Sequence, residues 1–78
     1  MKIEVLGTGC PKCNQLYANA EEAAQALGLD YEMVKVKDLN EIMAYGVMMT
    51  PALSIDGTIK STGKALSVDE IKSMLSSL

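Results

Sequence analysis

Hydrophobic positions in the first third of the chain follow two different periods. A short apolar-rich run at 2–6 predicts a strand. A helical spacing follows it and predicts a helix over 11–27, which ends where Gly28 is placed to supply a C-terminal cap. The apolar face of this helix is formed by Leu16, Ala20, Ala23, Ala24 and Leu27.

The middle of the chain predicts a second strand and a second, shorter helix. Apolar and charged residues alternate over 31–37, as they do in a strand with one exposed face. Asp38 and Glu41 then have the spacing of a capping box, and Gly46 ends the short helix that follows.

The last third predicts a hairpin and a final helix. Pro51 precedes an apolar run at 52–55, and Asp56-Gly57 is a tight-turn signal that joins this run to a strand at 58–60. The final helix is predicted by a second capping box, Ser67 and Glu70, and by an apolar stripe of Val68, Ile71, Met74, Leu75 and Leu78.

The expected order is therefore strand, helix, strand, helix, strand, strand, helix. The first two strands are expected to be parallel, because a helix joins them, and the last two are expected to be antiparallel. This order defines an α/β fold with a mixed sheet covered by helices. A length of 78 residues leaves room for one domain, which we expect to span 1–78.

Charge and hydropathy argue against two kinds of partner. Seven basic and ten acidic residues give a formal net charge of −3, whereas nucleic-acid binders carry clustered positive charge. Glu4 interrupts the first apolar run, and no later run approaches the roughly 20 apolar residues of a membrane span. We therefore expect no nucleic-acid or membrane partner, and a cytoplasmic protein.

Both cysteines lie where the first strand gives way to the first helix, in the segment Cys10-Pro11-Lys12-Cys13. Proline is favoured at the first helical position, which predicts Cys10 at the N-cap and Cys13 in the first turn. The unpaired N–H groups and the positive end of the helix dipole then favour the Cys10 thiolate. Cys13 is expected to be more buried, within reach of Cys10, and suited to resolving a mixed disulfide.

The residues leave three interpretations of this pair open. The spacing at a strand-to-helix turn is typical of a redox-active dithiol, whereas a purely structural bridge this short would contribute only about 2 kcal/mol. A soft-metal site is an alternative, because thiolates bind Cu(I), and two small apolar side chains are another. The chain has no histidine, which excludes Cys-His catalysis and histidine-containing metal sites.

The element order, the cysteine motif and the later Thr50-Pro51 resemble the thioredoxin superfamily, in particular its small, glutaredoxin-sized members from prokaryotes. The likeness covers nearly the whole chain and is carried by GTGCPKC at 7–13, TPALSIDG at 50–57 and SVDEI at 67–71. It implies a single-domain thioredoxin fold in which three helices cover a four-stranded mixed sheet. It also implies an enzyme, a thiol–disulfide oxidoreductase that uses no cofactor or metal.

The resemblance further implies roles for four residues. Cys10 would attack a substrate disulfide and Cys13 would resolve the mixed disulfide, so that the two form the redox-active disulfide. Pro51 would be a cis-proline facing the cysteines, and the backbone of Thr50 would pair with an extended substrate strand. Protein disulfides are then the substrates, and an unidentified reductase or dithiol donor is the partner.

Glu4 and two tyrosines leave smaller questions. Glu4 lies six positions before Cys10, and we expect its carboxylate to reach water from an early strand. The alternative, implied by the resemblance, is a buried acid that acts as a general base for Cys13. Tyr17 and Tyr45 are expected to be half-buried helix residues without a catalytic role.

The role of three methionines and one rival class of protein remain open. Met43, Met48 and Met49 form either an adaptable apolar surface for substrate proteins or part of the core. The rival class is a soft-metal carrier, since ferredoxin-like copper chaperones also carry two cysteines after their first strand. That fold needs two strands between its helices, where this chain predicts an Asp38-capped helix and a helical C-terminus.

Overall fold

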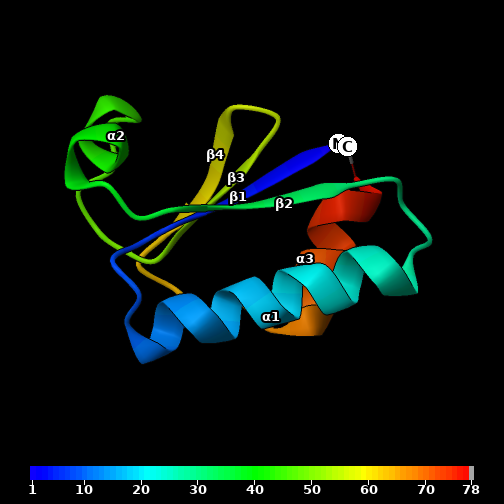
Figure 1. Ribbon diagram of the computed structural model, residues 1–78. Coiled ribbons are helices and arrows are strands. Elements are labelled where there is room, and N and C mark those ends of the chain that lie inside the picture. Colours follow the sequence, from blue (N-terminus) through cyan, green and yellow to red (C-terminus); the bar gives the residue numbers. More distant parts are fainter. Residues whose placement is uncertain (78) are drawn as a thin grey trace.

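The computed structural model describes residues 1–77 and contains a four-stranded sheet with three helices (Figure 1). Along the chain the elements are β1 (Lys2–Leu6), α1 (Pro11–Ala26), β2 (Glu32–Val36), α2 (Leu39–Ala44), β3 (Ala52–Ile55), β4 (Thr58–Thr62) and α3 (Val68–Ser76). The strands lie in the order β2-β1-β3-β4, and only the β1–β2 pair is parallel among the pairs described. The predicted α/β fold with a mixed sheet is confirmed. Leu78, the last residue of the predicted stripe, lies outside the described residues.

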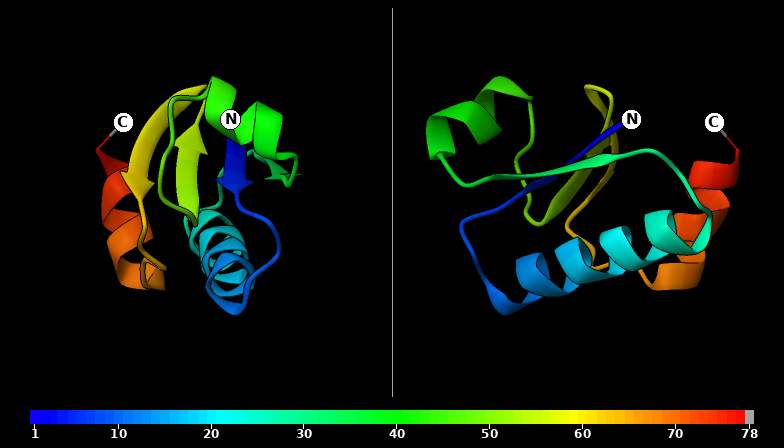
Figure 2. Two further views of the ribbon diagram at one scale, coloured as in Figure 1. Left: turned by 90° about the vertical axis from the view of Figure 1, so that its left-hand side faces the viewer. Right: turned by 45° about the vertical axis from the view of Figure 1, so that its right-hand side comes forward.

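The helices cover both faces of the sheet unequally, with α1 and α3 together on one face and α2 alone on the other (Figures 1 and 2). Side chains alternate along β1, so this strand contributes apolar residues to both faces of the sheet. Ile3 and Val5 face α1 and α3, while Leu6 faces α2. The larger apolar cluster has eleven buried members: Ile3, Val5, Leu16, Ala20, Ala23, Ala24, Leu53, Ile55, Leu66, Ile71 and Leu75. The smaller cluster, under α2, has five: Leu6, Val36, Ile42, Val47 and Ala52.

Two of the predicted helix starts differ in how they are capped. At α3 the Ser67 hydroxyl accepts from the Glu70 N–H and the Glu70 carboxylate accepts from the Ser67 N–H, each at 3.1 Å, so that capping box is confirmed. At α2 the Asp38 carboxylate instead accepts from the N–H of Asn40 at 2.8 Å. Asp38 is the N-cap as predicted, but the reciprocal bond that Glu41 would complete is not formed among the described contacts.

β4 is two residues longer than its sequence pattern indicates. Ser61 and Thr62 pair with Leu53 and Ala52, although their polar side chains give no strand signal. The register between β3 and β4 shifts at Leu53/Ser54, as at a β-bulge. The backbone pairing therefore extends β4 where the side-chain pattern does not predict it.

Ser67→Ala is expected to lower the free energy of unfolding by about 1 kcal/mol, because it removes one half of the α3 capping box. Urea unfolding monitored by circular dichroism measures the change. Ser76→Ala is the matched control, since Ser76 is exposed at the other end of α3. Equal losses in the two variants would contradict a stabilising role for the cap.

Candidate functional site

The two cysteines lie at the start of α1, in the positions that the sequence predicts. Cys10 is the N-cap in an extended conformation, with φ −67° and ψ 163°, and Pro11 begins the helix. The N–H of Cys13, one of the groups that a helix start leaves unpaired, donates to the Cys10 sulfur at 3.3 Å. Both cysteines carry free thiols.

The surroundings of the two sulfurs move their pKa values in opposite directions. Hydrogen bonds from the Cys13 thiol and then from the Cys13 N–H lower the pKa of Cys10, which is half-buried. Burial is the main cause that raises the pKa of Cys13, whose exposed fraction is only 5%. Cys10 is therefore the sulfur that more readily becomes the thiolate, the form that attacks disulfides.

Gly7 connects the cysteines to the segment around Pro51. A Cβ built on Gly7 would overlap the Cys13 sulfur and would lie 3.9 Å from the Pro51 Cα, so both residues border this glycine. The Thr50–Pro51 peptide bond is cis, the isomer that the resemblance implies, and Pro51 is fully buried. The fold thus brings residues from opposite halves of the chain to the same end of the sheet.

The residues just before Pro51 leave their backbone unpaired. Thr50 is exposed, and no turn, loop or cap hydrogen bond described for residues 1–77 involves the backbone of Met48, Met49 or Thr50. The carbonyl of Pro51 itself accepts from the Gly63 N–H at 2.8 Å, which ties the start of β3 to the end of β4. The unpaired groups at 48–50 therefore lie next to a residue whose own carbonyl is paired.

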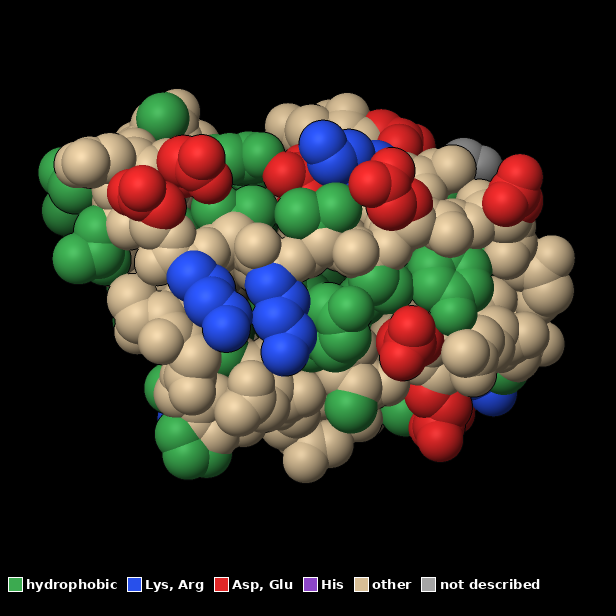
Figure 3. All heavy atoms as spheres, in the orientation of Figure 1, with side chains coloured by type: hydrophobic (Ala, Val, Ile, Leu, Met, Phe, Trp, Pro, Cys, Tyr) green, Lys and Arg blue, Asp and Glu red, His purple; other side chains and the backbone are tan. Residues whose placement is uncertain are grey.

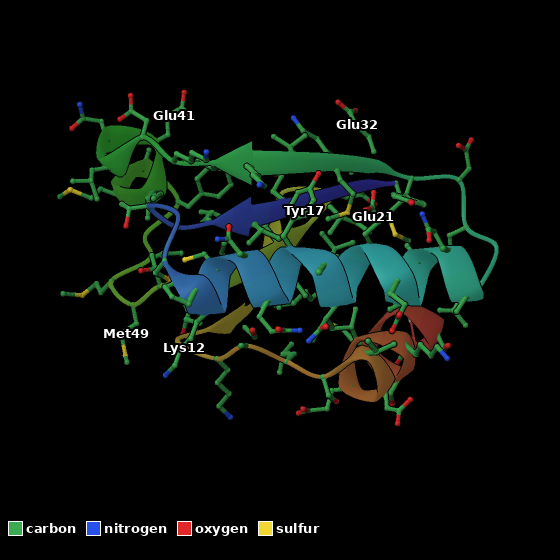
Figure 4. All side chains as sticks on the ribbon, turned by 60° about the horizontal axis from the view of Figure 1, so that its bottom comes forward. Lys12, Tyr17, Glu21, Glu32, Glu41 and Met49 are labelled. Atoms are coloured by element: carbon green, nitrogen blue, oxygen red, sulfur yellow. The ribbon has the colours of Figure 1, made fainter. Side chains whose placement is uncertain are left out.

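An apolar groove adjoins Thr50. It has a volume of about 330 Å³ and is lined by Leu39, Ile42, Met43, Val47, Met48 and Thr50. Met48 is 97% exposed, and Met43 and Met49 are also largely exposed, so the alternative that these methionines fill the core is wrong. In Figure 4 the Met49 side chain points outward at the end of the molecule where α1 begins, the end that also carries Lys12.

A much smaller hollow lies on the other side of the cysteines. It has a volume of about 10 Å³ and is lined by Val5, Gly7, Gly9, Cys13, Asn14, Lys35 and Lys37. The ammonium group of Lys35 also lies 4.7 Å from the centre of the Tyr17 ring, and Figure 4 shows Tyr17 on the side of α1 that faces the sheet. Neither lysine is among the candidate residues that the sequence indicates. Their two-residue spacing placed them on one face, but only the sheet order brings that face to α1.

Glu4 does not reach water, and our expectation for it is wrong. Its exposed fraction is 4%, and its carboxylate accepts a hydrogen bond from the Tyr45 hydroxyl at the end of α2. This bond to Glu4 is the main cause that raises the pKa of Tyr45. Alternation along β1 places Glu4 with Leu6 on the α2 face, whereas α1 covers the opposite face.

Two other kinds of site find no support in residues 1–77. No group of three or more His, Cys, Asp and Glu side chains is placed to hold a metal ion. Within the same residues no helix has the length and apolar character that crossing a bilayer requires.

A cysteine pair at the start of a helix, on a mixed α/β sheet, defines a protein of the thiol–disulfide oxidoreductase class. Comparison with known proteins agrees. The family model described as "Thioredoxin domain" matches residues 1–76. The chain is 51% identical over 75 residues to a thioredoxin of Methanocaldococcus jannaschii, covering 96% of this chain and 86% of the relative. It is 43% identical over 76 residues to a thioredoxin of Methanothermobacter thermautotrophicus, covering 97% of this chain and 99% of the relative. The chain belongs to the thioredoxin family and is a small thiol–disulfide oxidoreductase with a thioredoxin fold.

Alkylation by iodoacetamide at neutral pH is expected to label Cys10 before Cys13, because Cys10 is more exposed and has the lower pKa. The Cys10 labelling rate should reach half its maximum at a lower pH than that of an ordinary cysteine, because the pKa of Cys10 is lowered. Peptide mapping by mass spectrometry over a pH series measures both rates. Faster labelling of Cys13 would reverse the assignment of the accessible sulfur.

Gly7→Ala is expected to lower the free energy of unfolding by about 1–3 kcal/mol, as overpacking of a core commonly does, because the new methyl group meets the Cys13 sulfur. The displaced sulfur should also form the Cys10–Cys13 disulfide more slowly. Urea unfolding and the rate of oxidation by excess dithiodipyridine measure the two effects. Thr8→Ala, at the exposed neighbouring position, is the control and should change neither.

Proposed function

We propose that this protein exchanges a Cys10–Cys13 dithiol for the disulfides of other proteins through a mixed-disulfide intermediate. The observation that carries the proposal is the asymmetry of the two sulfurs. Cys10 is accessible and has a lowered pKa, whereas Cys13 is buried one helical turn away with a raised pKa. An accessible nucleophile beside a protected second thiol is the arrangement that a two-step exchange requires.

In the first step the Cys10 thiolate attacks one sulfur of a substrate disulfide. A new S–S bond forms between Cys10 and that sulfur, and the other substrate sulfur leaves as a thiolate. In the second step Cys13 loses its proton to solvent and attacks Cys10, so the Cys10–Cys13 bond forms and the second substrate thiolate leaves. The protein dithiol has then given up two electrons, which a reductase or dithiol donor must return. We propose that this cycle runs in the cytoplasm.

The segment before Pro51 is the proposed site for the substrate chain. The unpaired backbone of Thr50 can extend the hydrogen bonding of an extended substrate strand, and Pro51 adds no N–H donor there. The groove that begins at Thr50 has an apolar, adaptable lining in Met43 and Met48, which suits protein substrates of different sequence. Glu4 takes part in no step of the proposed exchange, because its carboxylate is hydrogen-bonded to Tyr45 on the α2 face.

The copper-carrier alternative has less support. The two cysteine sulfurs lie together at the start of α1, and no larger cluster of His, Cys, Asp and Glu occurs in residues 1–77. The thioredoxin fold also differs from the ferredoxin-like fold in which we expected such a carrier. Competition with a Cu(I) chelator remains the direct test of this alternative.

Cys13→Ser is expected to accumulate mixed disulfides with insulin through Cys10, because the first step proceeds and the second cannot. Cys10→Ser should accumulate few, since the remaining thiol is buried. Non-reducing electrophoresis followed by mass spectrometry measures the trapped adducts, and dithiothreitol should release them. If Cys10→Ser trapped as much insulin as Cys13→Ser, the proposed order of attack would be wrong. If neither trapped any and the wild type reduced no insulin, the proposed function itself would fail.

A further inference from the structure

Neither Lys35 nor Lys37 takes part in the proposed exchange, although both border the hollow that Cys13 lines. Lys35 lies in β2, and Lys37 follows the last residue of that strand. Residues two apart on extended backbone project to the same face, so the two side chains lie together beside the start of α1. Figure 3 shows two lysine side chains next to each other on the face between β2 and α1, with acidic side chains only around the margin of this area.

The first turn of the helix that these lysines face does not offset their positive charge. The first turn of α1 contains no acidic residue, although helix starts favour acidic residues there. The contact with the Tyr17 ring holds the Lys35 ammonium on the α1 side of β2. The chain as a whole carries a net charge of −3, so this region has the opposite sign from the molecule around it.

We propose that Lys35 and Lys37 select disulfide substrates that carry an anionic group, such as a carboxylate, a few bonds from the reacting sulfur. The inference rests on the proposed function and adds a substrate class to it. The hollow itself holds no more than about one water molecule, so the anion binds at its mouth, over the two ammonium groups. In this position it is attracted while Cys10 attacks, and the leaving thiolate gains negative charge near the same lysines.

Three small disulfides that differ in charge test the inference on the full chain. Dithiobis(nitrobenzoate) is anionic, dithiodipyridine is neutral and cystamine is cationic. The rate constant for the first thiol released from reduced protein is measured for each by stopped flow. Each rate constant is divided by the rate constant of the same disulfide with free dithiothreitol, which corrects for intrinsic reactivity. After this correction the wild type should react fastest with the anionic disulfide, more slowly with the neutral one and most slowly with cystamine.

The double variant Lys35→Gln/Lys37→Gln should lower the anionic-to-neutral rate ratio by about 3- to 10-fold, the size expected when two exposed charge pairs are lost. The double variant Lys35→Arg/Lys37→Arg should restore the ratio, because it restores the charge. The ratio of the wild type should also fall with added salt, since the screening length shortens from about 10 Å at 0.1 M to about 3 Å at 1 M.

Lys60→Gln is the matched control, because Lys60 lies exposed on β4, at the opposite edge of the sheet from β2. It removes one positive charge, where the Lys35/Lys37 variant removes two, and should leave the ratio unchanged. An unchanged ratio in the Lys35/Lys37 variant, or an equal fall with Lys60→Gln, would overturn the inference while leaving thiol–disulfide exchange intact. Failure of the wild type to react with the neutral disulfide would instead count against the proposed function.

Discussion

The hydrogen bond from the Cys13 N–H to the Cys10 sulfur is the contact on which the site depends. It exists because Pro11 begins α1 and leaves Cys10 as the N-cap, so a sulfur takes the place that a serine or aspartate oxygen usually occupies. Cys13 lies in the first turn that this cap begins, where its buried sulfur borders Gly7. One helix start therefore leaves one thiol accessible and the other protected.

Much of the fold follows from local sequence patterns. The bounds of β1 and β3 agree with the apolar runs at 2–6 and 52–55, and α1 ends one residue before its predicted limit. These elements have strong signals, since apolar periodicity and turn residues act over a few neighbouring positions. The end of β4 was missed because Ser61 and Thr62 are held by backbone pairing with β3, which a side-chain pattern does not report.

The candidate site was predictable only in part, and for a comparable reason. The positions of Cys10 and Cys13 follow from the local chemistry of a helix start. The burial of Glu4 depends instead on Tyr45, 41 residues away, and the approach of Lys35 to α1 depends on β2 lying beside β1. Charged residues in a short strand look exposed until the partner from a distant segment is known. The sequence therefore predicts the reacting atoms better than the groups that surround them.

The placement of α2 alone on its face of the sheet affects how the two parts of the site move. α2 spans only Leu39–Ala44 and is held by a cluster of five buried residues and by the Tyr45–Glu4 hydrogen bond, whereas α1 shares a cluster of eleven with α3. Because local opening costs less where fewer apolar contacts are buried, we expect amide hydrogens of α2 to exchange with solvent sooner than those of α1. The apolar groove therefore lies on the more adaptable part of the protein, and the sulfurs lie on the more rigid part. An adaptable apolar surface and a rigid cysteine pair are thus combined in one small sheet.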